Sequence, residues 1–193
     1  MLNQLPPLKE SPSQTAGPYV HIGMTPSLES ITGPNVKDLG SGPITAGTGP
    51  RIAVTGRIFD GSGAPVSDAV VELWQADADG NHAAAWGRVA TDGTGGFSFD
   101  TVKPGRVPGP DGKPMAPHLT LWIVARGINI GLHTRLYFED EAAANAADFV
   151  LNKILDPRRR KTLIAAKSER DGRSVYALDI RLQGEDETVF FDI

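Results

Sequence analysis

The chain has 193 residues, of which 40% are hydrophobic, a formal net charge of −4 and no cysteine. This length favours one domain with a substantial core, and the acidic balance gives no electrostatic reason to expect a nucleic acid as partner. The lack of cysteine excludes disulfides, thiolate metal sites and a cysteine nucleophile.

The start of the chain, residues 1–7, has no basic segment followed by an apolar run, so it does not resemble a signal peptide. No apolar stretch approaches the roughly 20 residues that a membrane span requires. We therefore expect a cytoplasmic protein that does not bind a membrane.

Residues 1–50 are rich in proline and glycine and show little hydrophobic periodicity. Such a segment buries too little apolar surface to fold by itself, yet it carries apolar side chains such as Tyr19 and Met24. We expect an arm that lies across another surface, which could belong to a partner subunit. A solvated tail is the alternative. The folded domain is expected to comprise residues 51–193.

Short runs rich in β-branched and aromatic residues begin after residue 50, and turn sequences such as Asp60-Gly61 and Asp171-Gly172 separate several of them. Their number and spacing favour an all-β fold, specifically a β-sandwich. The expected strands are residues 52–59, 69–76, 96–100, 118–125, 132–138, 174–182 and 188–191.

One or two short helices are expected late in the chain. Residues 139–147 are rich in alanine, and Asp156-Pro157 has the pattern of an N-cap followed by proline at the first helical position. We predict that this second helix continues to about Lys167. The sequence shows no internal repeat and no second domain.

Three segments superficially suggest ligand sites. The segment 77–81 has its glycine too early for a calcium-binding EF-hand loop, and Gly61-Ser62-Gly63 lacks the context of a phosphate loop, so both are predicted to be turns. The basic run 158–161 is better explained as a solvated or subunit-facing helix surface than as a nucleic-acid site.

The four histidines are His21, His82, His118 and His133. No two of them have the spacing that places two imidazoles on one face of a strand or helix. His118 shares a strand face with Thr120, whose hydroxyl is a poor metal ligand. By spacing alone, no complete metal site is present.

Five segments of the chain, in the same order, resemble the intradiol, non-haem iron(III) dioxygenases. They are QTAGPY at 14–19, VELWQAD at 71–77, TVKPG at 101–105, APH at 116–118 and TRLYF at 134–138. The resemblance is closest to an iron-free α-type subunit of this family, through RGINI at 126–130, LHTR at 132–135 and ETVFFD at 187–192.

In this family two tyrosines and two histidines hold the iron. Phenolates are hard anionic ligands that stabilise iron(III), and the catechol substrate occupies the remaining position. The resemblance places the tyrosine positions at His82 and near Val107, and the histidine positions at His118 and Thr120. Both phenolates are therefore lost, and we expect this chain to bind no metal.

The resemblance implies that a partner β-type subunit holds Fe(III) in a large αβ hetero-oligomer. In such enzymes the α-type arm lines the substrate cavity of the partner, a role that would fall here to Thr15, Gly17, Pro18 and Tyr19. The implied reaction is the cleavage of 3,4-dihydroxybenzoate by O₂ to a carboxylated muconate.

Arg135 replaces a glutamine that usually lies near the metal in iron-bearing members of the family. We expect it to share a strand face with His133 and Tyr137 and to point into the metal-free pocket. There it could take the place of the absent cation and bind an acidic neighbour or a carboxylate ligand. An ordinary structural salt bridge is the alternative.

Two other functions are weighed. A non-catalytic binding module for a carbohydrate or peptide predicts a stable monomer with a surface row of aromatic residues, although the chain has only 3 Trp and 3 Tyr. A self-sufficient metalloenzyme that uses His82 and His118 predicts stoichiometric metal in the isolated chain.

Overall fold

The computed structural model describes residues 15–17, 19–34, 36, 38–82, 85–110 and 112–192, and it confirms the expected all-β class. The strands are β1 (Arg51–Phe59), β2 (Val70–Trp74), β3 (Trp86–Ala90), β4 (Gly96–Val102), β5 (His118–Val124), β6 (Leu132–Phe138), β7 (Ile164–Arg170), β8 (Arg173–Ala177) and β9 (Ile180–Arg181).

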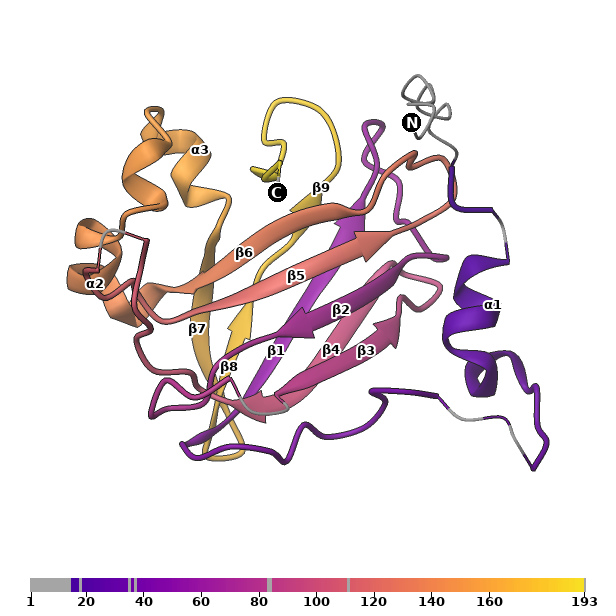
Figure 1. Cartoon of the computed structure of the whole chain (residues 1–193). Coiled ribbons are helices and arrows are strands. Elements are labelled where there is room, and N and C mark those ends of the chain that lie inside the picture. The colour runs from indigo at the N-terminus through magenta and orange to yellow at the C-terminus, as the bar shows by residue number, and fades with distance from the viewer. Residues whose placement is uncertain are drawn as a thin grey trace, which may run out of the picture.

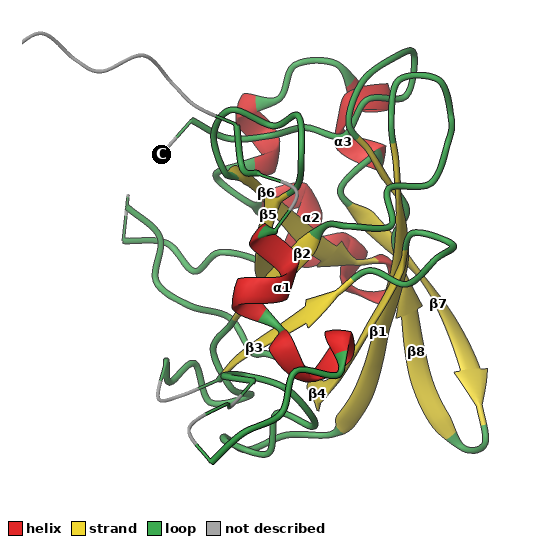
Figure 2. Ribbon diagram, turned by 90° about the vertical axis from the view of Figure 1, so that its right-hand side faces the viewer, coloured by secondary structure: helices red, strands yellow, loops and turns green. Residues whose placement is uncertain are grey.

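The strands follow the order β3-β2-β5-β6-β7-β8-β1-β4, and β9 pairs with β1. Figure 1 shows β3, β2, β5 and β6 as the front layer, with β1, β4, β7 and β8 behind it. Strand β7 joins the two layers, because residues 164–165 pair with β6 and residues 166–170 pair with β8. Figure 2 shows these layers from the side. The path is therefore that of a β-sandwich.

The core lies between the two layers. On β5 the inward side chains Leu119, Leu121 and Ile123 are fully buried, and on β1 Ile52 and Val54 face them within one hydrophobic cluster. Each such side chain contributes about 1.5–3 kcal/mol through burial. The alternate residues of β5 consequently point to the outer face of the front layer, which is where the candidate site lies.

Two of the predicted turns are confirmed. Asp77 Oδ1 accepts hydrogen bonds from the backbone amides of Asp79 (3.0 Å) and Asn81 (2.9 Å). Asp60 Oδ1 accepts from those of Ser62 (2.8 Å) and Ala64 (2.9 Å). Each aspartate stabilises its own turn, as short polar side chains do in such positions.

The helical elements are short. They are α1 (Val20–Met24), η1 (Pro26–Glu29), η2 (Glu139–Glu141), α2 (Ala142–Ala147), η3 (Leu151–Lys153) and α3 (Pro157–Lys161). Helix α2 and the start of α3 are confirmed, and Asp156 caps α3 by accepting from Arg158 N at 2.8 Å. Helix α1 was not predicted. Among the described residues, no helix has the length and apolar character to cross a bilayer.

The predicted end of α3, near Lys167, is wrong. The helix ends at Lys161, and β7 begins at Ile164. The sequence from Ala165 to Lys167 is compatible with a helix, but β6 and β8 offer backbone hydrogen-bonding partners on both sides of this segment. Tertiary pairing overrides local propensity here.

Three strand predictions also need correction. Residues 188–191 form only an isolated bridge, in which Phe191 N donates to His133 O at 2.8 Å. The stretch 174–182 is divided into β8 and β9. Strand β3 was missed, because Gly87, its second residue, interrupts the pattern of side chains. A Cβ at Gly87 would lie 2.7 Å from Ile44 Cδ1.

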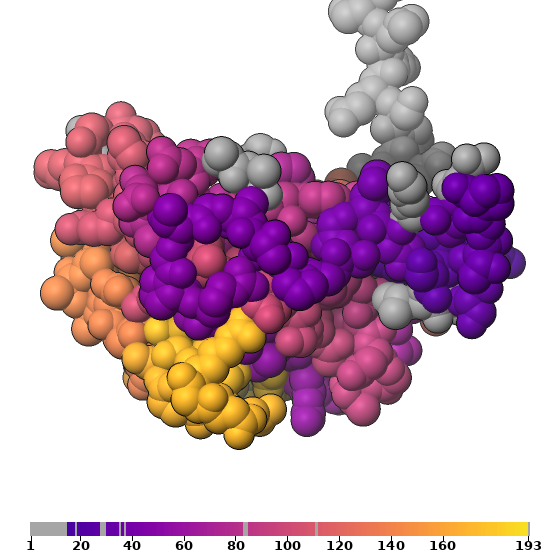
Figure 3. Space-filling model, turned by 90° about the horizontal axis from the view of Figure 1, so that it is seen from below, coloured from indigo at the N-terminus to yellow at the C-terminus, as the bar shows by residue number. Residues whose placement is uncertain are grey.

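The segment 38–50 lies across this chain's own sandwich. Gly40 O accepts from Arg88 N at 2.8 Å, and Ile44 N donates to Asp100 O at 2.8 Å while its side chain enters the core. In Figure 3 the indigo-to-violet segment spreads over the underside of the molecule. The solvated-tail alternative is therefore wrong for residues 38–50, whereas a contact of the arm with a partner remains a proposal.

Candidate functional site

The four positions expected for iron ligands line one small cavity. His118 and Thr120 come from the outward face of β5, His82 from the loop after β2, and Val107 from the loop after β4. The cavity measures about 90 Å³. The sequence motifs therefore identified residues that the fold brings together.

His118 is held in a neutral form. Its Nδ1 lies 2.8 Å from Ala116 O, and burial, reinforced by the positive charge of Arg135, lowers the pKa of His118 to about 4. The ring is tilted by 33° against that of Tyr137, with centroids 5.6 Å apart. An imidazole in this state keeps one ring nitrogen for a hydrogen bond in the cavity, provided that Nδ1 carries the proton.

The lining residues do not fit a ferric ion. Val107 offers only hydrocarbon, Thr120 a neutral hydroxyl, and His82 and His118 imidazoles, so the described lining of the cavity offers no anionic ligand. Iron(III) requires hard anionic oxygen donors to neutralise its charge. Within the described residues, no group of three or more His, Cys, Asp or Glu could hold a metal ion.

Arg135 lines a second cavity of about 390 Å³, which shares Thr120 with the first. Thr120 and Arg135 are paired across β5 and β6. Arg135 Nη1 donates to Tyr137 Oη at 3.2 Å and lies 3.7 Å from Met115 Sδ. Arg135 therefore shares a strand face with Tyr137, as expected. It lies beside the 90 Å³ cavity of His118 and Thr120 and does not line it.

Tyr137 lies between Arg135 and the nearby carboxylate of Asp148. The Tyr137 hydroxyl donates to Asp148 Oδ1 at 3.2 Å, and burial raises the pKa of Tyr137. Asp148 is fully buried and also accepts from the backbone amides of Ala116, Val150 and Leu151, each at 2.9 Å. No ion pair of Arg135 is found among the described residues, so the alternative of an ordinary structural salt bridge is not found there. The hydroxyl of Tyr137 bonds to both Arg135 and Asp148.

The first described residues of the arm are anchored to the loop that follows β5. Ala16 N donates to Ile128 O at 3.1 Å, and Gly127 N donates to Thr15 Oγ1 at 2.7 Å. Tyr19 is 75% exposed, and a Cβ on Gly17 would meet nothing within 4 Å. Pro18 lies outside the described residues. The roles predicted for these residues in substrate binding remain a proposal.

The anchor itself was missed in the sequence. The segment around Arg126 was noted only for its resemblance, yet it forms a bridge with Ala16. Gly127 has a φ of 87°, a conformation that favours glycine and turns the backbone amide toward Thr15. A glycine three residues after the end of β5 was the available signal.

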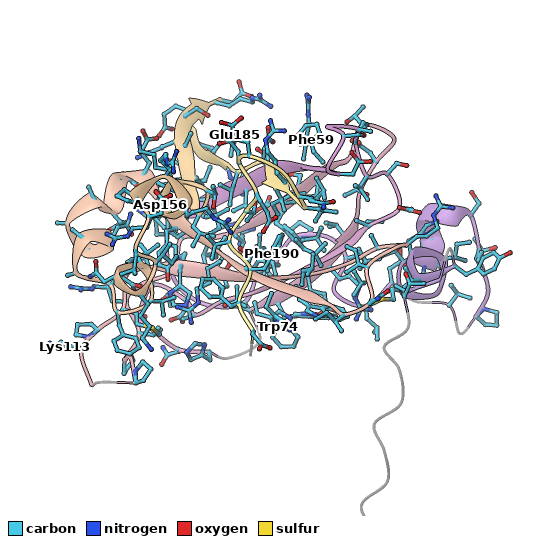
Figure 4. All side chains as sticks on the ribbon, turned by 90° about the horizontal axis from the view of Figure 1, so that it is seen from above. Phe59, Trp74, Lys113, Asp156, Glu185 and Phe190 are labelled. Atoms are coloured by element: carbon cyan, nitrogen blue, oxygen red, sulfur yellow. The ribbon has the colours of Figure 1, made fainter. Side chains whose placement is uncertain are left out.

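A cluster of tryptophans adjoins the two cavities. Trp74, Trp86 and Trp122 are the three tryptophans of the sequence, and all lie on the outer face of β2, β3 and β5. Glu72 accepts from Trp74 Nε1 at 3.0 Å and pairs with Arg88 at 2.6 Å. Figure 4 shows Trp74 on the side of the molecule opposite Phe59. Sequence reasoning missed this grouping, which requires the strand register.

Comparisons with known proteins agree with the resemblance that the sequence motifs indicated. A family model described as "Dioxygenase" matches residues 26–184. The protocatechuate 3,4-dioxygenase alpha chain of Pseudomonas putida is 49% identical over 96% of this chain and 97% of its own length. The beta chain of the enzyme from Burkholderia cepacia is 30% identical over 72% of this chain and 67% of its own length.

A solved structure supports the fold. The 3-chlorocatechol 1,2-dioxygenase of Rhodococcus opacus 1CP aligns with a TM-score of 0.57 at 23% identity, covering 70% of this chain and 60% of that chain. Fold and relatives together define an all-β chain of the ring-cleaving dioxygenase type, and no tyrosine stands among the described residues that line the 90 Å³ cavity. The chain belongs to the intradiol ring-cleavage dioxygenase family.

Proposed function

We propose that this chain is the iron-free α subunit of a protocatechuate 3,4-dioxygenase and acts with a ferric β subunit in the cytoplasm. The αβ enzyme would cleave 3,4-dihydroxybenzoate with O₂ between its two hydroxyl-bearing carbons, giving 3-carboxy-cis,cis-muconate in the catabolism of aromatic compounds. The iron supplies the activation of the bound catechol, and the partner holds it.

One observation carries this proposal. The chain is similar to an alpha chain over almost its whole length, yet the cavity at the four ligand positions offers no anionic donor. A self-sufficient metalloenzyme is not favoured by a cavity lined with Val107 and Thr120. A family member without ferric ligands has a catalytic role only when another chain supplies the metal.

The contribution of this chain is the arm. Thr15 and Ala16 are held on the loop 126–128, so the residues next to them have a defined position on this chain. Tyr19 is largely exposed and Gly17 has open space, so this chain does not itself require either residue at its position. We propose that Thr15, Gly17, Pro18 and Tyr19 complete the partner's substrate pocket. Tyr19 would supply a flat face and a hydroxyl.

The test is co-expression with a β-type chain from the same source, with an affinity tag on this chain only. We expect the untagged chain to co-elute and the eluate to consume O₂ with protocatechuate. A tagged chain that elutes alone as a stable monomer contradicts the proposal and favours the binding-module alternative. That alternative has one supporting observation in the tryptophans on the outer sheet face.

A further inference from the structure

The cavity that contains Arg135 has the size and lining of a small-molecule site. Its volume is about 390 Å³, within the range of about 300–1,000 Å³ that such sites occupy. Phe149 and Phe191 give it aromatic walls, and Thr120 adds a hydroxyl. The lining also includes His133, whose buried Nδ1 has no hydrogen-bond partner in the structure.

Two cations in this cavity lack a carboxylate partner among the described residues. Among the described residues, the Arg135 guanidinium interacts with the Tyr137 hydroxyl, the Met115 sulfur and the Phe191 ring, whose centroid lies 5.9 Å away. The Lys153 ammonium lies 4.3 Å from the centroid of the Phe149 ring. Most of the guanidinium donors are therefore left for a ligand.

The nearby carboxylates do not neutralise these charges. Asp148 is fully buried, and its oxygens already accept bonds from three backbone amides and the Tyr137 hydroxyl. Asp192 lines the cavity but forms no ion pair with Arg135 or Lys153 in the part of the chain that the structure describes. With Arg135 and Lys153 against Asp192, the described lining carries a net formal charge of +1 between aromatic walls.

We propose that this cavity binds a small planar carboxylate, of the benzoate type, with Arg135 and Lys153 as its anion-binding groups. The guanidinium forms two parallel hydrogen bonds with the carboxylate, since its planar fork matches that geometry. Lys153 adds a second positive charge, and Phe149 and Phe191 contact the ring. The inference goes beyond the proposed function, because the cavity belongs to this chain and binds without a partner.

The proposal is tested by titrating benzoate into the purified full chain in a calorimeter, with benzyl alcohol as the probe that lacks the carboxylate. We expect saturable binding of one benzoate, and an affinity for benzyl alcohol about tenfold lower or less, corresponding to the loss of a charge-assisted pair. Crystals of the αβ complex soaked in 4-bromobenzoate should show anomalous bromine density beside Arg135.

Three variants assign the binding groups. Arg135→Gln should weaken benzoate binding about tenfold, and Arg135→Lys by less, because the ammonium keeps the charge but loses the fork. Lys153→Gln should weaken it about threefold, as expected for a partly solvated charge. Arg158→Gln is the matched control, because Arg158 is an exposed cation paired with Asp156 outside the cavity, and its Kd should not change.

Circular dichroism establishes that each variant is folded. If Arg135→Gln does not fold, the benzoate affinity of Lys153→Gln tests the proposal. Three results overturn the proposal: no saturable benzoate binding, equal affinity for benzyl alcohol, or an unchanged Kd in the folded cavity variants. Because the titration uses the chain without its partner, these results are separable from a failure of the proposed αβ activity.

Discussion

The arm and the surroundings of His118 differ in how far their residues are buried within this chain. Around the cavity, Asp148 and Tyr137 are fully buried, and hydrogen bonds link them to each other and to three loop amides. In the arm, Tyr19 is 75% exposed and Gly17 contacts nothing that would clash with a side chain. Asp148 and Tyr137 thus stabilise this chain, whereas the exposed side chain of Tyr19 is available to another surface.

The largest effect should come from Asp148. Asp148→Ala leaves three backbone amides and the Tyr137 hydroxyl without their acceptor, and each buried donor left unsatisfied costs about 1–3 kcal/mol. Because the loop can relax partly, we expect the free energy of unfolding to fall by about 3–5 kcal/mol in urea denaturation.

Asp186→Ala serves as the control for Asp148→Ala, because Asp186 is exposed, and such a change should stay within about 0.5 kcal/mol. A loss for Asp148→Ala that matches the control would show that the cavity does not stabilise the chain. Asp148 would then contribute no more to the free energy of unfolding than an exposed residue.

Deleting residues 1–19 should mainly affect the αβ complex. We expect kcat/KM for protocatechuate to fall about 100-fold, because a substrate pocket that loses its positioning groups commonly loses that much. The iron content of the partner should stay the same. An unchanged kcat/KM in the truncated complex would refute a catalytic role for the arm.

His118 should make stability depend on pH. Its pKa is about 4 in the folded chain and about 6.5 when unfolded, so the unfolded state binds more protons between these values. The depressed pKa therefore destabilises the fold as the pH falls below about 6.5, by about 2 kcal/mol between pH 7 and pH 5. Above that pKa both states are neutral, and the effect is absent.

His118→Gln should remove this part of the pH dependence. Denaturation of the two proteins at pH 7 and at pH 5 measures it, since shifts of the carboxylates are common to both. Equal pH dependence in the variant and the parent would mean that His118 is not held neutral in the fold.

Gly17→Ala should give the smallest effect and the sharpest contrast. The isolated chain should keep its Tm, because the added methyl meets nothing and Gly17 has no left-handed backbone conformation. In the αβ complex we expect kcat/KM to fall about tenfold, about 1.4 kcal/mol, through a clash at the partner's pocket. Gly23→Ala, in α1 and likewise open, is the control; it should leave kcat/KM unchanged and raise the Tm slightly, because alanine favours a helix more than glycine does.

Part of this molecule could be predicted from its sequence. Alternation of apolar residues was sufficient for β5 and β6, whose inward side chains form the core. The collinear motifs identified His82, Val107, His118 and Thr120, which line one cavity. The loops after β2 and β4 bring His82 and Val107 to the first residues of β5.

Other features depend on contacts between distant segments. Strand β7 exists because β6 and β8 pair with it, and local propensity favoured a helix. Asp148 could not be found in the sequence, since its role depends on Ala116, 32 residues away. The grouping of Trp74, Trp86 and Trp122 likewise follows from strand register and not from spacing.

The most direct test of the central claim is the iron content and visible spectrum of this chain alone and after assembly with the β-type subunit. The chain alone should be colourless, contain no stoichiometric iron and consume no O₂ with protocatechuate. The assembled complex should contain one iron per αβ unit, absorb in the visible range through phenolate-to-iron(III) charge transfer, and turn over. Stoichiometric iron in the isolated chain, lost in His118→Gln, would contradict the account.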